Sequence, residues 1–265
     1  MEIGFFFWPY DVALVGAMAE AADAFGYDMV GIADTPGNAM DPWVATTLLA
    51  ARTRRARVAV CVSNLDTRHP AVSAASIASI DLLAPGRAVL GIGVGHSGTR
   101  NLGAPSLLAA ELAEGVVFLK ELLRARPASY RGGTAHLPWV KRSSPVFLAA
   151  SHPRSLKAAG AHADGVFVNY GLGLDDVKWS EGTVTQAALA EGRKADDVEI
   201  WQIACLDCGA DGEASRRKIG AILAFVSAYI MGRGDLARRG GPPEHPAPPG
   251  ELPRRFRTRP RDPGR

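Results

Sequence analysis

Residues 57–95 read RVAVCVSNLDTRHPAVSAASIASIDLLAPGRAVLGIGVG. Two short apolar runs, Arg57–Val62 and Ala88–Val94, flank a helical pattern at Pro70–Leu83, and a Pro-Gly pair ends that pattern. Both runs are continuously apolar instead of alternating with polar residues, which is typical of parallel strands covered by helices. This stretch therefore predicts a strand–helix–strand unit within a parallel α/β sheet.

The same strand-then-helix unit recurs on both sides of this stretch. We expect further strands at Ile3–Phe7, Met29–Ala33, Val146–Ala150, Gly165–Asn169 and Val198–Cys205, and helices at Asp11–Phe25, Asp41–Arg52, Leu107–Arg124, Arg154–His162, Asp175–Gly192 and Gly212–Ile230, with a small hairpin within Ala128–Pro138. Seven successive units favour a TIM-type (β/α)8 barrel over an open sheet, and a length of 265 residues suits one such domain. No eighth unit is recognisable, so the expected α/β barrel is incomplete.

The last 34 residues break the pattern. Residues 232–265 hold eight Pro, nine Arg and six Gly, and such a segment buries too little apolar surface to offset its ordering entropy. We therefore expect a barrel domain at residues 1–231 and a disordered tail at 232–265. Two origins of the tail stay open: a natural disordered extension, or a frameshift in a G+C-rich gene that replaced the eighth unit.

The charge of the chain outside its last 34 residues is nearly balanced, as in many enzymes. The net charge of +3 comes from the tail, where nine Arg oppose four acidic residues, so the remaining chain holds 21 basic and 23 acidic residues. This distribution gives no reason to expect a nucleic-acid partner. The start of the chain lacks the features of a signal peptide, and the apolar run 221–231 is too short to span a membrane. A cytoplasmic enzyme acting on a small molecule is the expectation.

The three cysteines, Cys61, Cys205 and Cys208, cannot form a disulfide framework. Cys205 and Cys208 are spaced C-x-x-C, but a structural zinc site needs four ligands and no second pair exists. We therefore expect no metal site, and we expect this pair to pack in the core at the end of the last strand.

A glycine pattern ends the fourth strand. Gly93, Gly95 and Gly98 satisfy G-x-G-x-x-G, so a nicotinamide-dependent dehydrogenase is a competing hypothesis. However, that fingerprint belongs on the first strand of a dinucleotide-binding unit and opens directly into a helix. Close strand packing explains Gly91 and Gly93, whereas contact between the backbone and a ligand ring explains Gly95 and Gly98 better.

Several motifs, taken in order, resemble a known family. They are Thr67–Val72 (TRHPAV), Leu83–Arg87 (LAPGR) leading into Leu90–Gly95 (LGIGVG), Tyr130–Gly132 (YRG), Pro145–Ser151 (PVFLAAS) and Ala159–Gly165 (AGAHADG). Together they resemble the bacterial luciferase-like monooxygenases and deazaflavin-dependent reductases from residue 1 to about 230. The run His96–Gly103 (HSGTRNLG) is most similar to the methylenetetrahydromethanopterin reductase branch. The resemblance implies coenzyme F420 or FMN as cofactor, and possible homodimers.

The resemblance also implies where the cofactor lies. Its ring would rest at the C-terminal ends of the strands, on a bulge at Cys61, Val62, Ser63 and Asn64 that often contains a non-proline cis peptide in the family. The phosphate of its tail would meet backbone amides at Ala149, Ala150 and Ser151, although Ser-His-Pro at 151–153 departs from the glycine-rich family pattern.

Polar and aromatic residues at other strand ends complete the expected site. Asp34 and His96 are the candidate catalytic groups; a proton donor and a solvated loop residue are equally good interpretations of His96. Thr99 and Asn101 are candidates to bond the edge of the ring. Trp8 and Tyr170 end the first and sixth strands and are candidates to line a substrate pocket, while His69 is more suited to bracing a helix.

Hydride transfer is the chemistry that these residues and the resemblance predict. With FMN, monooxygenation of a small organic substrate is an alternative, because reduced FMN reacts with oxygen. Two other hypotheses stay open: an incomplete barrel with little or no activity, and the nicotinamide-dependent dehydrogenase suggested by the glycine pattern.

Overall fold

The computed structural model describes residues 1–95, 98–99, 102–103 and 107–229. The chain divides into two compact units, Met1–Gln202 and Ile203–Arg265, and each is considered by itself. None of the described helices is long and apolar enough to cross a lipid bilayer.

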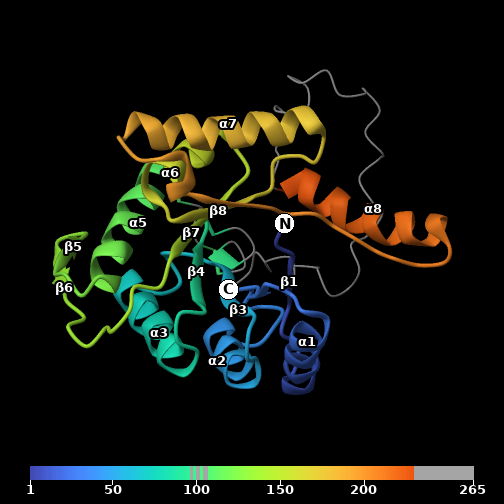
Figure 1. The fold of residues 1–265 in the computed structure, drawn as a ribbon, viewed down its shortest axis with the longest axis horizontal. Coiled ribbons are helices and arrows are strands. Elements are labelled where there is room, and N and C mark those ends of the chain that lie inside the picture. The colour runs from blue at the N-terminus through green and yellow to red at the C-terminus, as the bar shows by residue number, and fades with distance from the viewer. Residues whose placement is uncertain (96–97, 100–101, 104–106, 230–265) are drawn as a thin grey trace, which may run out of the picture. The chain divides into compact units, whose positions relative to one another are not determined.

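A seven-stranded parallel sheet organises the first unit (Figure 1). Its strands, in spatial order, are β1 (Gly4–Phe7), β2 (Met29–Ile32), β3 (Arg57–Ser63), β4 (Ala88–Ile92), β7 (Val146–Ala150), β8 (Gly165–Val168) and β9 (Glu199–Gln202). The intervening helices are α1 (Val12–Phe25), α2 (Pro42–Arg52), α3 (Pro70–Leu83), α5 (Ala109–Leu123), α6 (Pro153–His162) and α7 (Leu174–Ala190). Spatial order equals chain order without a reversal, so the predicted incomplete barrel of β/α units is confirmed.

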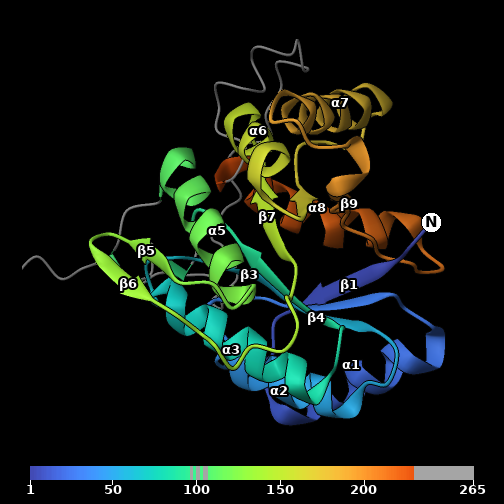
Figure 2. The same ribbon diagram turned by 60° about the vertical axis from the view of Figure 1, so that its left-hand side comes forward.

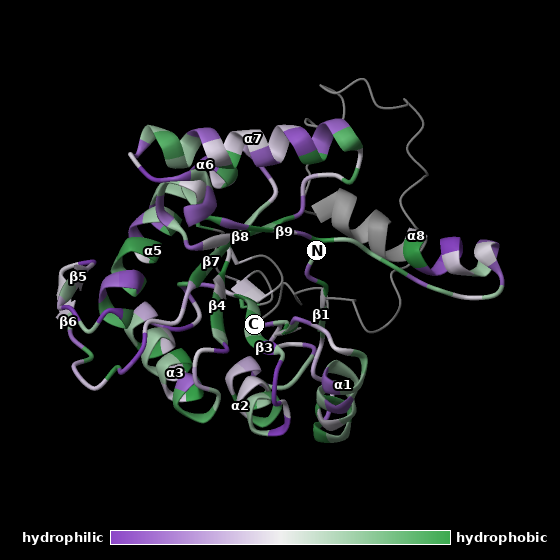
Figure 3. Cartoon of the chain, in the orientation of Figure 1, coloured by the Kyte–Doolittle hydropathy of each residue, from purple (hydrophilic) through white to green (hydrophobic). Residues whose placement is uncertain are grey.

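Alternate residues of each strand face the helices. On the outer face, Val58, Val60, Leu90 and Ile92 are fully buried in one apolar cluster with residues of the helices. Figure 2 shows α1, α2 and α3 along the lower side of the strands, and Figure 3 shows largely apolar strands beside helices of mixed hydropathy. This burial supplies the main driving force for folding, at roughly 25 cal/mol per Å² of apolar surface.

The inner face is filled at the N-terminal ends of the strands. Arg57 on β3 bonds Glu199 on β9 at 2.5 Å, although these strands are four positions apart in the sheet. The Arg57 guanidinium lies 5.3 Å from the ring centre of Phe147, and the Trp201 indole donates to Glu199. Side chains from distant strands therefore meet across the interior, which shows that the sheet is curled.

Local sequence explains where the helices begin. Asp11 caps α1 by accepting from the amide of Leu14 at 2.7 Å, and Gly26 ends α1 with a left-handed φ of 71°. Asp41 and His69 cap α2 and α3 in the same way, each followed by a proline at the first helical position. The predicted hairpin is present as β5 (Ala128–Tyr130) and β6 (Gly133–Ala135).

The end of the seventh strand differs from the prediction. Strand β9 ends at Gln202, which pairs with Val168, the last residue of its partner β8. Cys205 and Cys208 consequently lie beyond the strand, the first partly buried and the second exposed. The expectation that this pair packs in the core is wrong.

The second unit contains one described helix, α8 (Gly212–Tyr229). Asp211 accepts from the amides of Glu213 and Ala214 at 2.9 and 3.2 Å, which caps the helix. Lys218 of its second turn lies 3.3 Å from the carboxylate of Asp207.

Candidate active site

A bulge in β3 lies at the C-terminal end of the sheet. Val60 pairs with Leu90 and Ser63 pairs with Ile92, so β3 holds one residue more than β4 over the same length. The peptide bond between Cys61 and Val62 is cis, at the position where the family resemblance implies such a bond.

Glycines on both neighbouring strands make room for the bulge. A Cβ added to Gly31 on β2 would lie 2.7 Å from the Cβ of Cys61, and one added to Gly93 after β4 would lie 2.9 Å from Cγ2 of Val62. At Gly91 an added Cβ would lie 2.4 Å from the carbonyl oxygen of Val60. Close strand packing therefore accounts for Gly91 and Gly93, as expected. Burial raises the pKa of the Cys61 thiol to about 12, so this thiol is neutral.

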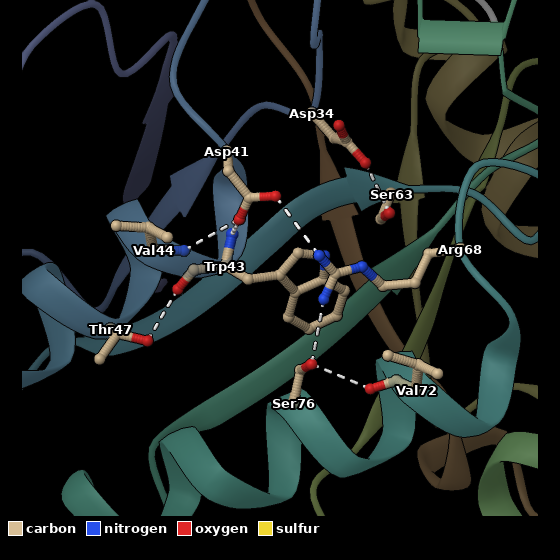
Figure 4. Close-up of polar contacts among 9 residues, drawn as sticks. All are labelled: Asp34, Asp41, Trp43, Val44, Thr47, Ser63, Arg68, Val72 and Ser76. Atoms are coloured by element: carbon tan, nitrogen blue, oxygen red, sulfur yellow. Dashed lines mark hydrogen bonds and ion pairs between the residues drawn. The ribbon is translucent and has the colours of Figure 1, made fainter.

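An aspartate–serine pair borders the bulge. The Ser63 hydroxyl donates to Oδ2 of Asp34 at 2.6 Å, and Figure 4 shows the two side chains facing each other from the ends of β2 and β3. Burial raises the pKa of Asp34, and Asp41 raises it further, while the hydrogen bond from Ser63 and the charge of Arg68 act in the opposite direction. Asp34 is therefore a carboxyl group suited to holding and releasing a proton.

Asn64 shapes the loop that follows β3. Its side-chain oxygen accepts from the amides of Asp66 and Thr67 at 3.0 and 2.8 Å and from the Thr67 hydroxyl at 3.0 Å. The side chain of Asn64 is buried, and these bonds use its acceptor to hold the turn into the Thr67–Val72 motif.

The glycine pattern folds back onto the same strand ends. Gly95 has a φ of 72°, and the buried Thr99 hydroxyl donates to its carbonyl oxygen. A Cβ added to Gly98 would lie 3.4 Å from the Asp34 carbonyl oxygen and 3.5 Å from Nδ2 of Asn64. Thr99 thus belongs to this group, although its hydroxyl proton is used by the backbone. His96 and Asn101 lie outside the described residues.

The predicted phosphate site lies beside the bulge. The Cβ of Ala149 is 3.5 Å from the position of an added Cβ on Gly93, so the end of β7 adjoins the bulge. Ala150 is buried and Ser151 is partly exposed at the start of α6. Ser155 caps that helix by bonding the backbone of His152 at 2.9 and 3.2 Å.

The two aromatic candidates take different positions. Trp8 lies beside Phe6, with ring centres 6.0 Å apart, and the Cβ of Phe6 is near Gly31 on the inner face. Tyr170 instead stacks on Trp179 of α7 at 4.6 Å and belongs to the outer apolar cluster. The structure brings Asp34, the bulge, Asn64, Thr99 and Ala149 together and leaves Tyr170 in the helical layer.

Sequence reasoning missed the residues around Arg68. The guanidinium of Arg68 lies over Trp43 and joins the starts of α2 and α3 (Figure 4). The sequence carries one signal, since Arg68 lies within the Thr67–Val72 motif, but that motif alone indicates no role for its side chain.

The order of the strands weighs against the dinucleotide hypothesis. A dinucleotide-binding sheet reverses its strand order and holds the ligand at the reversal, whereas the seven described strands follow one another around the sheet. The fold instead defines a (β/α)-barrel enzyme with its site at the C-terminal ends of the strands.

Comparison with known proteins identifies the family. The model of the luciferase-like monooxygenase family matches residues 10–254, which is most of the chain. The chain belongs to this family, and the predicted class of oxidoreductase is confirmed with it.

Named relatives agree with the family. The chain is 27% identical to 5,10-methylenetetrahydromethanopterin reductase of Methanolobus tindarius over 236 residues, covering 86% of this chain and 72% of the relative. It is 28% identical to the F420-dependent hydroxymycolic acid dehydrogenase of Mycobacterium tuberculosis over 198 residues, covering 68% of this chain and 53% of that protein.

Solved structures share the fold. The coenzyme F420-dependent tetrahydromethanopterin reductase from Methanopyrus kandleri superposes with a TM-score of 0.78 at 24% identity, covering 91% of this chain and 76% of that one. Monooxygenase RslO1 from Streptomyces bottropensis gives a TM-score of 0.71 at 23% identity, covering 90% of this chain and 82% of that one.

Proposed function

We propose that this protein binds F420 or FMN over the β3 bulge and catalyses hydride transfer to or from a small organic substrate. The observation that supports this most directly is the contrast between the two ends of the barrel interior. Toward the N-terminal ends, the Arg57 guanidinium lies over Phe147 and shares Glu199 with the Trp201 indole. At the C-terminal ends, Gly31 and Gly93 lie against the bulge, and Ala149 lies beside Gly93. Small residues around a backbone bulge suit the flat face of a fused ring.

The residues of the site have separate roles in this proposal. Cys61 and Val62 would support the ring, and the neutral Cys61 thiol adds no charge beneath it. The backbone of 149–151 and the start of α6 would face the phosphate, where exposed Arg154 in the first helical turn adds positive charge. The bound cofactor would supply the electron-transfer chemistry.

Asp34 is the group that would move a proton in this proposal. Its raised pKa and its hydrogen bond with Ser63 keep a protonatable carboxyl at a defined position on the rim of the site. His96 is the second candidate from the sequence for this role, and it lies outside the described residues. Asp34→Asn is expected to retain cofactor binding while lowering turnover roughly 10²-fold, the usual contribution of general acid–base catalysis.

The test is a titration of the purified full-length protein with FMN, F420 and NADP, followed by absorbance and fluorescence. We expect one of the two flavin-type cofactors to bind. Ala149→Leu should weaken that binding because its side chain would enter the ring site, whereas Ala110→Leu, on the exposed side of α5, should not. Binding of NADP alone, or equal effects of the two substitutions, would defeat the proposal.

The same titration distinguishes hydride transfer from monooxygenation. Relatives with F420 in their names support hydride transfer without oxygen, whereas the family description supports monooxygenation. Exclusive binding of F420 would favour the first chemistry, and exclusive binding of FMN the second. Oxygen uptake measured with the bound, reduced cofactor then checks the assignment.

A further inference from the structure

Arg68 connects the loop after β2 with the loop after β3 (Figure 4). Its Nη2 lies 3.4 Å from Oδ2 of Asp41, and its Nη1 donates to Oγ of Ser76 at 3.2 Å. The guanidinium also lies 5.2 Å from the ring centre of Trp43. One side chain therefore contacts the first residues of α2, the N-cap of α2 and the second turn of α3.

Asp41 uses its two carboxylate oxygens for different purposes. Oδ1 accepts from the amides of Trp43 and Val44 at 2.9 and 3.1 Å and caps α2, while Oδ2 faces Arg68. The segment between Asp34 and Asp41 is thus held at one end by Ser63 and at the other by Arg68. Both anchors come from β3 and the loop that follows it.

We propose that Arg68 is a positioning residue for Asp34, holding the β2–α2 loop through Asp41 and balancing the charge that Asp41 places near the Asp34 carboxyl. This inference rests on the proposed function, in which Asp34 carries the proton. In addition, Arg68, which lies outside the proposed ring site, sets the proton affinity of Asp34.

The charges around Asp34 determine in which direction its pKa should change when Arg68 or Asp41 is replaced. Among the described residues, the charged groups that act on Asp34 are Asp41, which raises its pKa, and Arg68, which lowers it. Loss of Arg68 removes a favourable charge and leaves Asp41 without its cationic partner, so the pKa of Asp34 should rise. Loss of the Asp41 charge should lower the pKa of Asp34, because a nearby like charge disfavours ionisation.

Carboxyl-carbon NMR of the cofactor-free protein, recorded as a pH titration, measures this directly. Asp34→Asn identifies the resonance. We expect the midpoint of Asp34 to rise in Arg68→Met, to change less in Arg68→Lys, which keeps the charge, and to fall in Asp41→Asn, which keeps a good helix N-cap. Arg142→Met is the control, because Arg142 pairs with Asp81 of α3 at 2.9 Å and is not among the charges that act on Asp34.

Cofactor titrations of the same variants supply a second readout. If Arg68 only stabilises the fold, Arg68→Met and Arg142→Met will lower the melting temperature alike and leave the Asp34 midpoint in place, which would overturn the inference. If the midpoint shifts as expected but Asp34→Asn keeps full turnover, Arg68 still positions Asp34, and the proposed role of Asp34 in proton transfer is the part that fails.

Discussion

Asp34 follows β2, and its carboxyl group is half-buried and bonded to Ser63 at the end of β3. The consequences can be measured in stability as well as in activity. Burial raises the pKa of Asp34 more than the Ser63 hydrogen bond lowers it. A carboxyl whose pKa is raised on folding contributes stability below its unfolded pKa, and that contribution is lost as the pH rises through the folded pKa. Ionised Asp34 is therefore a net cost at neutral pH.

Asp34→Asn should consequently stabilise the protein at pH 7.5. We expect a gain of up to about 1 kcal/mol in the free energy of unfolding, less than the full effect of a buried charge because Asp34 is partly exposed. The gain should shrink as the pH falls toward the ordinary range of carboxyl pKa values. Denaturant unfolding at several pH values checks this, and a variant less stable than the parent at pH 7.5 would contradict it.

Gly91 gives a second prediction at the residue scale. An added Cβ would lie 2.4 Å from the Val60 carbonyl oxygen, so Gly91→Ala should lower the free energy of unfolding by about 2–4 kcal/mol through overpacking at the bulge. Gly182→Ala is the matched control, because nothing lies within 4 Å of that position on α7 and alanine favours a helix there by about 0.5–1 kcal/mol. Equal effects at the two sites would show that the strands can separate.

Individual elements differ in how far the sequence predicts them. The bounds of α3 are those expected, because Pro70 starts the helix and the Pro-Gly pair after it stops it locally. The end of β9 could not be predicted in the same way, since it depends on where β8 stops. The place of Tyr170 at a strand end predicts a pocket residue. Tyr170 instead faces the helices, as do Val168 and Val166 two and four residues before it.

In the candidate site, too, features set by neighbouring residues can be predicted from the sequence, whereas contacts between residues far apart in the chain cannot. The bulge at 61–64 was expected from the family resemblance, and the cis bond lies within it. The contact between Asp34 and Ser63 joins residues 29 positions apart, and no spacing rule connects them. Likewise, Asp41-Pro42-Trp43 predicts the start of a helix but says nothing of the guanidinium that packs on the indole.

The Arg57–Glu199 ion pair links β3 with β9, and its contribution to stability can be tested by mutation. Glu199→Ala would leave the Arg57 guanidinium and the Trp201 indole without this shared acceptor. We expect a loss of about 1–2 kcal/mol in the free energy of unfolding, because polar groups stripped of a partner in a half-buried site lose more than the pair contributes. Arg124→Ala, which removes an exposed pair with Glu121, should cost less than about 0.5 kcal/mol.

At the scale of the whole sheet, β1 and β9 each pair with one strand among the described residues. Open strand edges offer backbone groups to other chains, so association that depends on protein concentration is expected. Ile3, just before β1, is 52% exposed, and a charge there should oppose edge pairing.

Ile3→Lys should therefore weaken self-association in sedimentation velocity runs over a range of concentrations. Leu189→Lys, which places the same charge on exposed α7, is the control and should have little effect. Association that is unchanged by Ile3→Lys but reduced by Leu189→Lys would locate the contact on the helices instead of the strand edge.

The glycines around the bulge carry one more consequence. In the proposed site, much of the surface beneath the cofactor ring would be main chain, because glycines border the bulge. A change of cofactor preference in this chain would then depend more on the loops around the bulge than on the side chains of the barrel wall. The segments after β2, β3 and β4 are accordingly the place to redesign selectivity, and the barrel wall is the part to leave alone.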